Sequence, residues 1–332
     1  MFIYALGHYF PDNILENAFF DKLDIGSSAD WIRDRVGIEA RRSVLTKEHV
    51  SDLRHGRTDR QSLKNAGQIE SIASMSEKSW KLALSRAHIV SEAIDTVIGG
   101  TSVPDDDIPA SACVVASQLG LERVRAFDVN SACSTFVVQC HVMRGLIASG
   151  LTTEGAIFCS ERYTTRMNYA DRRNSILFGD ASIATVVSST TKPGALKVID
   201  SLVESAPSGW EHIHLPDGNF FHQNGAAVQK FAVTKTIAAA QDILARNHLK
   251  VSEAHWFIGH QANYRMLTSA MDKMGVPESR HLYNVVQYGN QGACGAPSVL
   301  SQNWDRYQKG DYIVIAVVGA GLTWGSLLLQ KQ

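Results

Sequence analysis

Several patterns that would assign a compartment, a metal or a membrane are missing from this sequence. The chain has five cysteines, but it has no CxxC pair and no His/Cys cluster with the spacing of zinc ligands. No basic leader opens it, and no run of about 18 apolar residues follows. We therefore expect a cytoplasmic protein without disulfides, a bound metal, a signal peptide or a membrane-spanning helix.

Neither sign of charge is in excess. The 332 residues carry a net charge of -1, which gives no general affinity for nucleic acid or an anionic membrane. An acidic partner would therefore have to meet a local basic patch. The composition, 45% hydrophobic and 20% charged, is that of a globular protein long enough for one large domain or two fused halves.

Familiar catalytic signatures are missing too. There is no GxSxG nucleophile elbow, no Walker A lysine and no HExxH pair. The loop at residues 319–325 resembles a dinucleotide-binding fingerprint, but its spacing is GxGxxxG and a strand follows it in place of a helix. Its glycines would instead let backbone N–H groups approach a substrate oxygen, so the loop is a candidate oxyanion site.

What is present is a regular alternation of strand and helix patterns. Apolar strands are expected near residues 2–7, 96–100 and 155–159, each followed by polar loops and helical periods. This rhythm predicts a layered α/β protein with a mostly parallel sheet. A new series of strands starts after a Thr/Lys/Pro junction, which divides the chain into residues 1–190 and 191–332.

The stretch around Cys133 is a candidate reactive site. Residues 126–129 end a strand, and residues 133–148 are apolar all round before Gly150, which predicts a buried helix with Cys133 in its first turn. The positive end of the helix dipole would lower the pKa of a thiol there and so activate it as a nucleophile. The alternative is an inert core cysteine, as most buried cysteines are.

Two other positions favour ligand binding. His260 directly follows a strand expected at residues 254–259, and catalytic groups of open α/β sheets collect at such strand ends. Trp31 and Arg35 lie i, i+4 on one helical face, an arrangement that suits a nucleotide or a phosphate. The alternatives are a structural histidine, and a core tryptophan beside a solvated arginine.

Cys133, His260 and Asn290 are together the residue types that thiolate catalysis needs. The cysteine would attack a carbonyl, while the histidine and asparagine stabilise developing negative charge. Papain-like proteases use Cys, His and Asn in the same chain order. We reject that family because its local sequence around the cysteine is absent.

Six separated motifs stand in the order found in one family of condensing enzymes. The sequence resembles the β-ketoacyl-acyl-carrier-protein synthase III family over nearly its whole length. The resemblance implies a thiolase-like α/β fold, in which two duplicated βαβ-type halves form an αβαβα layered sandwich. The motifs are DWIxxRxGI (30–38), FDVxxAC (127–133), FGD (178–180), HQANxR (260–265), GN (289–290) and TWGS (323–326).

The resemblance also implies catalytic roles. Cys133 would take an acyl group from a thioester, and His260 with Asn290 would bind the thioester carbonyl of the second substrate. The backbone N–H groups of Cys133 and Ala320 would form the oxyanion hole. No cofactor is implied, because the substrates are themselves acyl thioesters of coenzyme A or of acyl carrier protein.

Binding roles follow from the same resemblance. Trp31 and Arg172 match positions that hold the adenine of coenzyme A, and Lys230 and Arg265 match basic positions that meet the acidic carrier protein. These lysine and arginine side chains would supply the local basic patch. The family forms homodimers, and Ile108 stands on a loop that would reach the acyl pocket of the partner.

Some departures from the family pattern affect the expected substrate. Residues 39–75 lack a sustained apolar period, so we expect an extended loop with at most one short helix, longer than a priming synthase needs. Ser-Thr-Phe follows Cys133 in place of Ala-Gly-Phe, Ala-Ser-Ile-Ala follows Asp180 in place of a glycine-rich turn, and Ala320 replaces a glycine. These differences favour a relative from secondary metabolism. Such relatives join a β-ketoacyl thioester to a second acyl thioester and cyclise the product to a cyclohexanedione precursor of dialkylresorcinols or stilbenes.

Two chemistries therefore remain open at this site. A malonyl extender forms its carbanion by losing carbon dioxide, as in the priming of fatty acid synthesis. A β-ketoacyl extender needs a base, for which His260 is favoured because the pKa of histidine lies near neutral pH, with Glu161 as a weaker candidate. A non-catalytic acyl-binding subunit is a third hypothesis. Acyl chain length, the extender and the choice between coenzyme A and carrier protein stay undetermined by the sequence.

Overall fold

Strands and helices alternate along the chain, and the expected strands near residues 2–7, 96–100 and 155–159 are confirmed. The computed structural model describes residues 1–87 and 93–332. The strands are β1 (Phe2–Tyr9), β2 (Asn13–Glu16), β3 (Ala40–Ser43), β4 (Thr96–Gly99), β5 (Arg125–Asp128), β6 (Glu154–Glu161), β7 (Ala181–Ser188), β8 (Leu196–Ser205), β9 (Ile213–His214), β10 (His222–Gln223), β11 (Trp256–Gly259), β12 (His281–Leu282), β13 (Tyr312–Gly319) and β14 (Thr323–Lys331). The helices are α1 (Asn17–Lys22), α2 (Ala29–Val36), α3 (Lys47–Arg54), α4 (Arg60–Asn65), α5 (Ile72–Ala87), α6 (Ser111–Gln118), α7 (Thr135–Ala148), α8 (Arg172–Ser175), α9 (Gly225–Arg246), α10 (Tyr264–Met274), α11 (Val285–Tyr288) and α12 (Gly295–Gln302).

The main sheet is built twice on one plan. Its ten strands lie in the order β12-β11-β13-β14-β8-β1-β7-β6-β4-β5. From the centre outward, the first half runs β1, β7, β6, β4, β5 and the second runs β8, β14, β13, β11, β12. Each half therefore contributes five strands to this sheet. Numbered in chain order within each half, they lie in the order first, fifth, fourth, second and third from the centre outward, and corresponding strand pairs are parallel or antiparallel alike.

The sheet is mixed, so the expectation of a mostly parallel sheet is wrong. The two outer pairs of each half are parallel, whereas the pairs nearer the centre are antiparallel. For β13 and β14 the reason is local, since a connection of only three residues can join two strands only when they run antiparallel.

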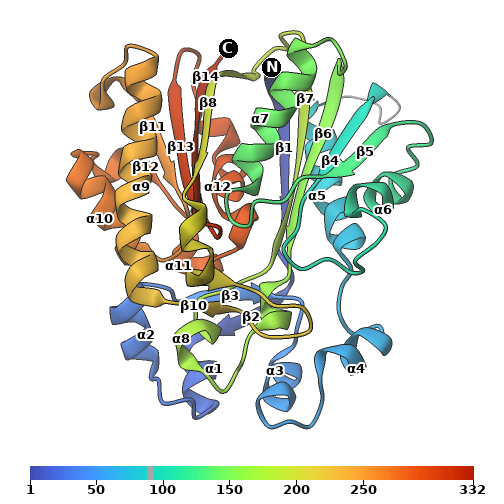
Figure 1. Ribbon diagram of the computed structural model, residues 1–332, viewed down its shortest axis with the longest axis vertical. Coiled ribbons are helices and arrows are strands. Elements are labelled where there is room, and N and C mark those ends of the chain that lie inside the picture. The colour runs from blue at the N-terminus through green and yellow to red at the C-terminus, as the bar shows by residue number, and fades with distance from the viewer. Residues whose placement is uncertain (88–92) are drawn as a thin grey trace.

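Helices cover the sheet in three layers (Figure 1). α5 and α6 lie outside the first half, α9 and α10 lie outside the second, and α7 with α12 lie between the halves. Each of these two middle helices packs on strands of both halves, α7 on β6, β8 and β14, and α12 on β1, β7 and β11. The thiolase-like α/β fold is therefore confirmed. The division at residues 190 and 191 stays a prediction. No helix in the described part of the chain combines the length and the apolar character needed to span a bilayer.

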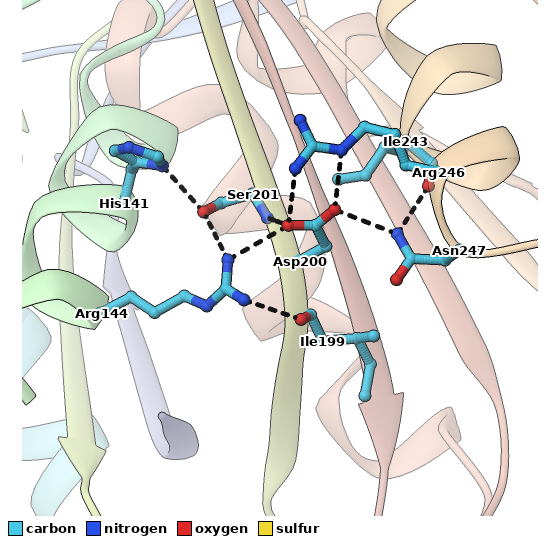
Figure 2. A network of polar contacts seen from close by, with 8 residues as sticks. All are labelled: His141, Arg144, Ile199, Asp200, Ser201, Ile243, Arg246 and Asn247. Carbon is cyan, nitrogen blue, oxygen red and sulfur yellow. Dashed lines mark hydrogen bonds and ion pairs between the residues drawn. The ribbon is translucent and has the colours of Figure 1, made fainter. Parts of the chain in front are cut away.

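A network of polar contacts ties α7 to the second half. The carboxylate of Asp200, on β8, binds Arg144 of α7 at 3.2 Å and Arg246 of α9 at 3.1 Å. Asn247, at the end of α9, donates to the same carboxylate at 3.2 Å, and His141 of α7 contacts Ser201 at 2.9 Å. Figure 2 shows these side chains converging on β8 from both neighbouring helices. The network fixes α7 against the sheet near the C-terminal end of the helix.

Residues 39–75 are not the extended loop that the sequence predicted. They contain β3, α3 and α4 and run into α5. α3 is capped by Thr46, whose side chain accepts a hydrogen bond from the His49 N–H, and α4 is capped by Asp59. Each short helix buries a single apolar anchor, Val50 or Leu63, which is too few for a periodic pattern.

Candidate active site

One cavity of about 650 Å³ gathers most of the predicted site residues. A volume of this size suits a small-molecule ligand. Residues from both halves of the chain line it, because the loops that follow β6, β11 and β13 meet in front of α7. The predicted residues that line it are Trp31, Arg35, Cys133, Arg172, His260, Asn290 and Ala320.

Cys133 lies on a tight turn just before α7, not in the first turn of the helix as expected. Ala132 has φ of 47°, in the left-handed region, so the helix cannot start there and begins instead at Thr135. The side chain of Asn130 accepts from the Ala132 N–H at 2.9 Å, and that of Thr135 accepts from the Ser131 N–H at 2.7 Å. These bonds hold the strained turn and present Cys133 to the cavity.

The residues that depart from the family pattern have structural roles at this turn. The Ser134 hydroxyl bonds the Ser131 hydroxyl at 2.9 Å and the Thr323 hydroxyl at 2.7 Å. Thr323 starts β14, so this contact ties the turn to the loop that carries Ala320. Gly319 allows the approach, because a Cβ there would lie 3.0 Å from both the Ser131 oxygen and the Ser134 nitrogen.

The prediction of a lowered thiol pKa is wrong. Burial raises the pKa of the Cys133 thiol to about 12, and the nearby charge of Glu161 adds to the rise. The neighbouring Tyr163 hydroxyl acts in the opposite sense and lowers the thiol pKa. Since Cys133 precedes α7 and desolvation dominates, the thiol is protonated at neutral pH in the free protein and needs a proton acceptor to react.

His260 follows β11, and its position at the strand end is confirmed. The side chain is only 9% exposed, and its Nδ1 atom has no hydrogen-bond partner among the described residues. Burial lowers the pKa of His260 to about 4. The expectation of a histidine base with a pKa near neutral pH is therefore wrong, and the imidazole is neutral and available as a hydrogen-bond donor.

Asn290 has its side-chain amide held in one orientation. Its Oδ1 atom accepts from the Gly292 N–H at 3.0 Å, so Nδ2 is the atom left for a ligand. Backbone bonds from Asn290 to Leu177 and from Gly179 to Asn290 fix the residue beside the FGD motif. Asn290 can therefore donate hydrogen bonds into the cavity at a fixed position.

Trp31, Arg35 and Arg172 lie together on the cavity wall. Ser28 caps α2, which carries the first two. The Arg172 guanidinium stands 4.5 Å from the centroid of the Trp31 ring, a cation–π contact. Both side chains line the cavity, but Arg35 is also exposed and Trp31 is partly buried against a hydrophobic cluster, so a ligand-binding role and the structural alternative both stay open.

The other predicted positions lie outside the cavity. Lys230 on α9 and Arg265 on α10 are exposed beside it, next to the lining residues Gln229 and Met266. Ile108 is 84% exposed on the loop before α6 and does not line the cavity of its own chain. Their binding roles stay predictions. In the described residues, no group of three or more His, Cys, Asp or Glu side chains is arranged to hold a metal ion.

An aromatic cluster at the cavity was missed by the sequence analysis. Tyr163 lies 4.8 Å from Phe178 and 6.0 Å from Phe221, measured between ring centroids, and all three line the cavity. Phe178 belongs to the FGD motif, but nothing in the local sequence marks Tyr163, which becomes part of the site only through the fold. Glu161, two residues earlier, is fully buried and is not part of the cavity lining.

Comparisons with known proteins agree with this geometry. Residues 127–207 match the model of 3-oxoacyl-[acyl-carrier-protein (ACP)] synthase III, and residues 244–331 match the model of the C-terminal part of that enzyme. A β-ketoacyl-[acyl-carrier-protein] synthase III of Sulfurovum sp. (strain NBC37-1) is 32% identical over 98% of this chain and 94% of its own. The protein of the same name from Clostridium perfringens (strain 13) is 31% identical over 98% of both chains.

A solved structure shows the same similarity in three dimensions. The 3-oxoacyl-[acyl-carrier-protein] synthase III of Aquifex aeolicus VF5 superposes with a TM-score of 0.88 and 28% identity, over 99% of each chain. Sequence motifs, the repeated sheet and full-length relatives therefore agree. This chain belongs to the 3-oxoacyl-[acyl-carrier-protein] synthase III family of ketosynthase III condensing enzymes.

Proposed function

We propose that this protein extends an acyl group held on Cys133 with a malonyl thioester, in a decarboxylative condensation of the kind that primes fatty acid synthesis. The names of the similar proteins support this chemistry over the joining of a β-ketoacyl and a second acyl thioester, which the departures in sequence had favoured. Two of those departures, Ser134 and Thr135, have a structural reason, since their hydroxyl groups hold the turn of Cys133.

The proposal depends mainly on one observation, that the imidazole of His260 is neutral. A β-ketoacyl extender requires a base to take its α-proton, and an imidazole with a pKa of about 4 is a weak base at neutral pH. Glu161, the other base considered, is not part of the cavity lining. A malonyl extender needs only hydrogen-bond donors to its carbonyl, which neutral His260 and the Asn290 amide can supply.

The condensation then follows in two steps. In the first, the Cys133 sulfur attacks the donor thioester, a new thioester forms on Cys133, and the departing thiolate takes up a proton. In the second, the malonyl thioester loses carbon dioxide, and the electron pair left on its α-carbon attacks the acyl carbonyl on Cys133. N–H groups of Cys133 and Ala320 stabilise the resulting oxyanion. Its collapse expels the Cys133 thiolate and releases the β-ketoacyl product.

Partners are proposed from the same site. Trp31 and Arg172 would hold the adenine of a coenzyme A thioester, while Lys230 and Arg265 would meet an acidic carrier protein. A homodimer would bring Ile108 to the acyl pocket of the partner. We propose a cytoplasmic location for this reaction.

Intact-mass measurement tests the proposal. We expect an acyl adduct on the pure protein after incubation with a panel of acyl thioesters, and none on the Cys133→Ser variant. Addition of malonyl thioester should then release carbon dioxide and a linear β-ketoacyl product. A cyclic dione formed from a β-ketoacyl thioester and a second acyl thioester, without malonyl thioester, would establish the other condensation. The absence of an adduct with every donor would point to a non-catalytic acyl-binding subunit.

A further inference from the structure

Three buried amide side chains connect the chain segments that carry His260 and Asn290. Gln261 directly follows His260 in the sequence, and Gln291 directly follows Asn290. The Oε1 atom of Gln261 accepts a hydrogen bond from the Asn284 N–H at 3.0 Å, and the Nε2 atom of Gln291 donates to the Oδ1 atom of Asn284 at 3.2 Å. A continuous series of hydrogen bonds therefore runs from the residue beside His260 to the residue beside Asn290.

Gln261 holds the chain on both sides of His260. Its Nε2 atom donates to the Gly259 carbonyl at 2.8 Å, and its Oε1 atom also accepts from the Val285 N–H at 3.2 Å. Gly295 leaves room for this side chain, because a Cβ there would lie 2.9 Å from that of Gln261. The end of β11, which carries His260, is therefore fixed against the start of α11.

Asn284 and Gln291 close the segment that carries Asn290. They lie on either side of α11, and their hydrogen bond joins the two ends of residues 284–291. Asn284 is itself anchored to α12, since its Nδ2 atom donates to the Ser298 hydroxyl and to the Gln302 side chain, both at 2.8 Å. Asn290 is thus held from this side as well as by its backbone bonds to the FGD motif.

These amides cost free energy to bury. Gln261 and Gln291 have no exposed surface, and the Oε1 atom of Gln291 has no hydrogen-bond partner among the described residues. A buried polar atom without a partner costs free energy that an apolar side chain of similar size would avoid. Packing alone therefore does not account for Gln291, whereas its directional bond to Asn284 does.

We propose that Gln261, Asn284 and Gln291 are positioning residues that set the distance between the hydrogen-bond donors of His260 and Asn290. This inference rests on the proposed function and concerns its second step, in which both donors bind the carbonyl of the malonyl thioester. Two donors stabilise the charge that develops on one oxygen only when both reach it with hydrogen-bond geometry. A misplacement of about 1 Å can slow a reaction by about a hundredfold.

The first step of the reaction supplies an internal reference. None of the hydrogen bonds that the described structure shows for the three amides reaches the turn of Cys133 or the loop of Ala320. Formation of the acyl thioester on Cys133 should therefore not depend on them. A variant that only loosens the whole fold would slow both steps, whereas a variant that changes the spacing of the two donors would slow the second step alone.

Separate measurement of the two steps on Gln291→Met tests the proposal. Acylation of Cys133 is followed by intact mass with the donor thioester that gives the highest yield of adduct, and carbon dioxide release from saturating malonyl thioester is followed on the acylated protein. Methionine keeps the volume of the side chain and removes its donor. We expect carbon dioxide release to slow by about tenfold or more and acylation by less than about twofold. The midpoint of thermal unfolding should stay close to the wild-type value, because the substitution also removes the unpartnered Oε1 atom.

A double variant shows whether the amides act as one unit. If they do, Gln261→Met combined with Gln291→Met will release carbon dioxide about as slowly as the slower single variant. If each loss is local, the two fold-changes will multiply, which would overturn the proposal. An equal slowing of both steps in Gln291→Met, or a wild-type rate of carbon dioxide release, would also overturn it. This single variant decides alone if Gln261→Met does not fold.

Gln139→Met is the matched control. Gln139 is another fully buried amide, and its Nε2 atom donates to the Phe158 carbonyl at 3.1 Å. It lies on α7, so any disturbance of Cys133 would slow both steps, and the ratio of the two rates should equal that of the wild type. If the wild type forms no adduct or releases no carbon dioxide, the proposed function fails. If the wild type completes both steps and Gln291→Met keeps the ratio of their rates, only the positioning role fails.

Discussion

Helix α7 carries a different kind of polar site at each of its ends. Near its C-terminal end, the Asp200 carboxylate is paired with two arginines and accepts further bonds from Ser201 and Asn247 (Figure 2). At its N-terminal end, Cys133 faces a cavity, and Glu161, the carboxylate whose charge acts on its thiol, forms no ion pair in the described structure. Both regions bury ionisable groups, but only the first pairs their charges.

As a result, the pKa shifts in the two regions favour opposite states: the charged form of Asp200, but the neutral forms of the groups at the cavity. Burial alone would raise the pKa of Asp200, but its hydrogen bonds and arginine partners outweigh burial and hold the pKa below its ordinary value. At the cavity, burial dominates, and it raises the pKa of Cys133 and of Glu161 and lowers that of His260. A paired site thus keeps its charges and stabilises the fold. The cavity keeps its groups neutral or easily neutralised, which costs stability and leaves protons free to move.

The largest expected effects come from alanine variants of two cysteines, Cys133 just before α7 and Cys140 within it. Cys133→Ala should reduce acyl transfer by about a thousandfold or more, because the nucleophile is lost, and should change the free energy of unfolding by less than about 1 kcal/mol. Cys140→Ala, at a fully buried thiol on the same helix, should do the reverse and lower stability by about 1 kcal/mol with activity retained. Acylation rates and denaturant unfolding measure both effects. Equal losses of activity in the two variants would contradict the assignment of Cys133.

The second prediction concerns the pH dependence that His260 introduces. Its pKa in the folded protein, about 4, lies below the value of about 6.5 expected in the unfolded chain, so the unfolded chain binds a proton first as the pH falls. Stability should therefore fall between about pH 6.5 and pH 4, by roughly 3 kcal/mol from this residue alone. In His260→Gln, the slope of the free energy of unfolding against pH should become smaller in this range, by an amount that corresponds to nearly one bound proton.

The control for this prediction must account for Glu161. The pKa of its carboxyl is raised in the folded protein, so Glu161 destabilises the native state as the pH rises toward 8 and partly masks the histidine. The difference between wild type and His260→Gln removes that contribution. His55→Gln, at an exposed histidine of α3's C-terminus, serves as the matched variant. An unchanged slope in His260→Gln would show that the pKa of the imidazole is the same in the folded and unfolded states.

The third prediction concerns Asp200→Ala, which removes the ion pairs near the C-terminal end of α7. Loss of the carboxylate leaves Arg144 and Arg246 without their partner and should lower the free energy of unfolding by about 2 kcal/mol, below the value for a fully buried pair because both arginines are partly exposed. Acyl transfer by the folded protein should persist. Glu204→Ala, at an exposed carboxylate on the same strand, should change stability by less than about 0.5 kcal/mol. A large loss of activity in Asp200→Ala would mean that the two ends of α7 are coupled.

The contrast between the regions also explains what could be predicted from the sequence. The types and chain order of Cys133, His260 and Asn290, together with strand ends, were sufficient to place them in one site. The pKa of His260 was not predictable because it depends on burial. The pKa of Cys133 was not predictable, because it depends on burial and then on Glu161 and Tyr163, which the fold brings near Cys133 from 28 and 30 residues away. The network of Asp200 was missed for the same reason, since Arg144 is 56 residues distant. The helices within residues 39–75 were missed because each has only one buried apolar anchor.

The smallest expected effect lies at the cavity wall, where Arg172 stacks on Trp31. Arg172→Ala should raise KM for a coenzyme A thioester by about three- to tenfold and leave kcat unchanged, because the contact would bind adenine equally in the ground and transition states. Arg33→Ala, on α2 outside the cavity, is the matched control. A pantetheine thioester, which has no adenine, should show no difference between wild type and Arg172→Ala. If the pantetheine thioester showed the same rise in KM, Arg172 would contact the acyl end of the substrate. The cavity would then contain a charged group, the Arg172 guanidinium, that binds the reacting part of the substrate.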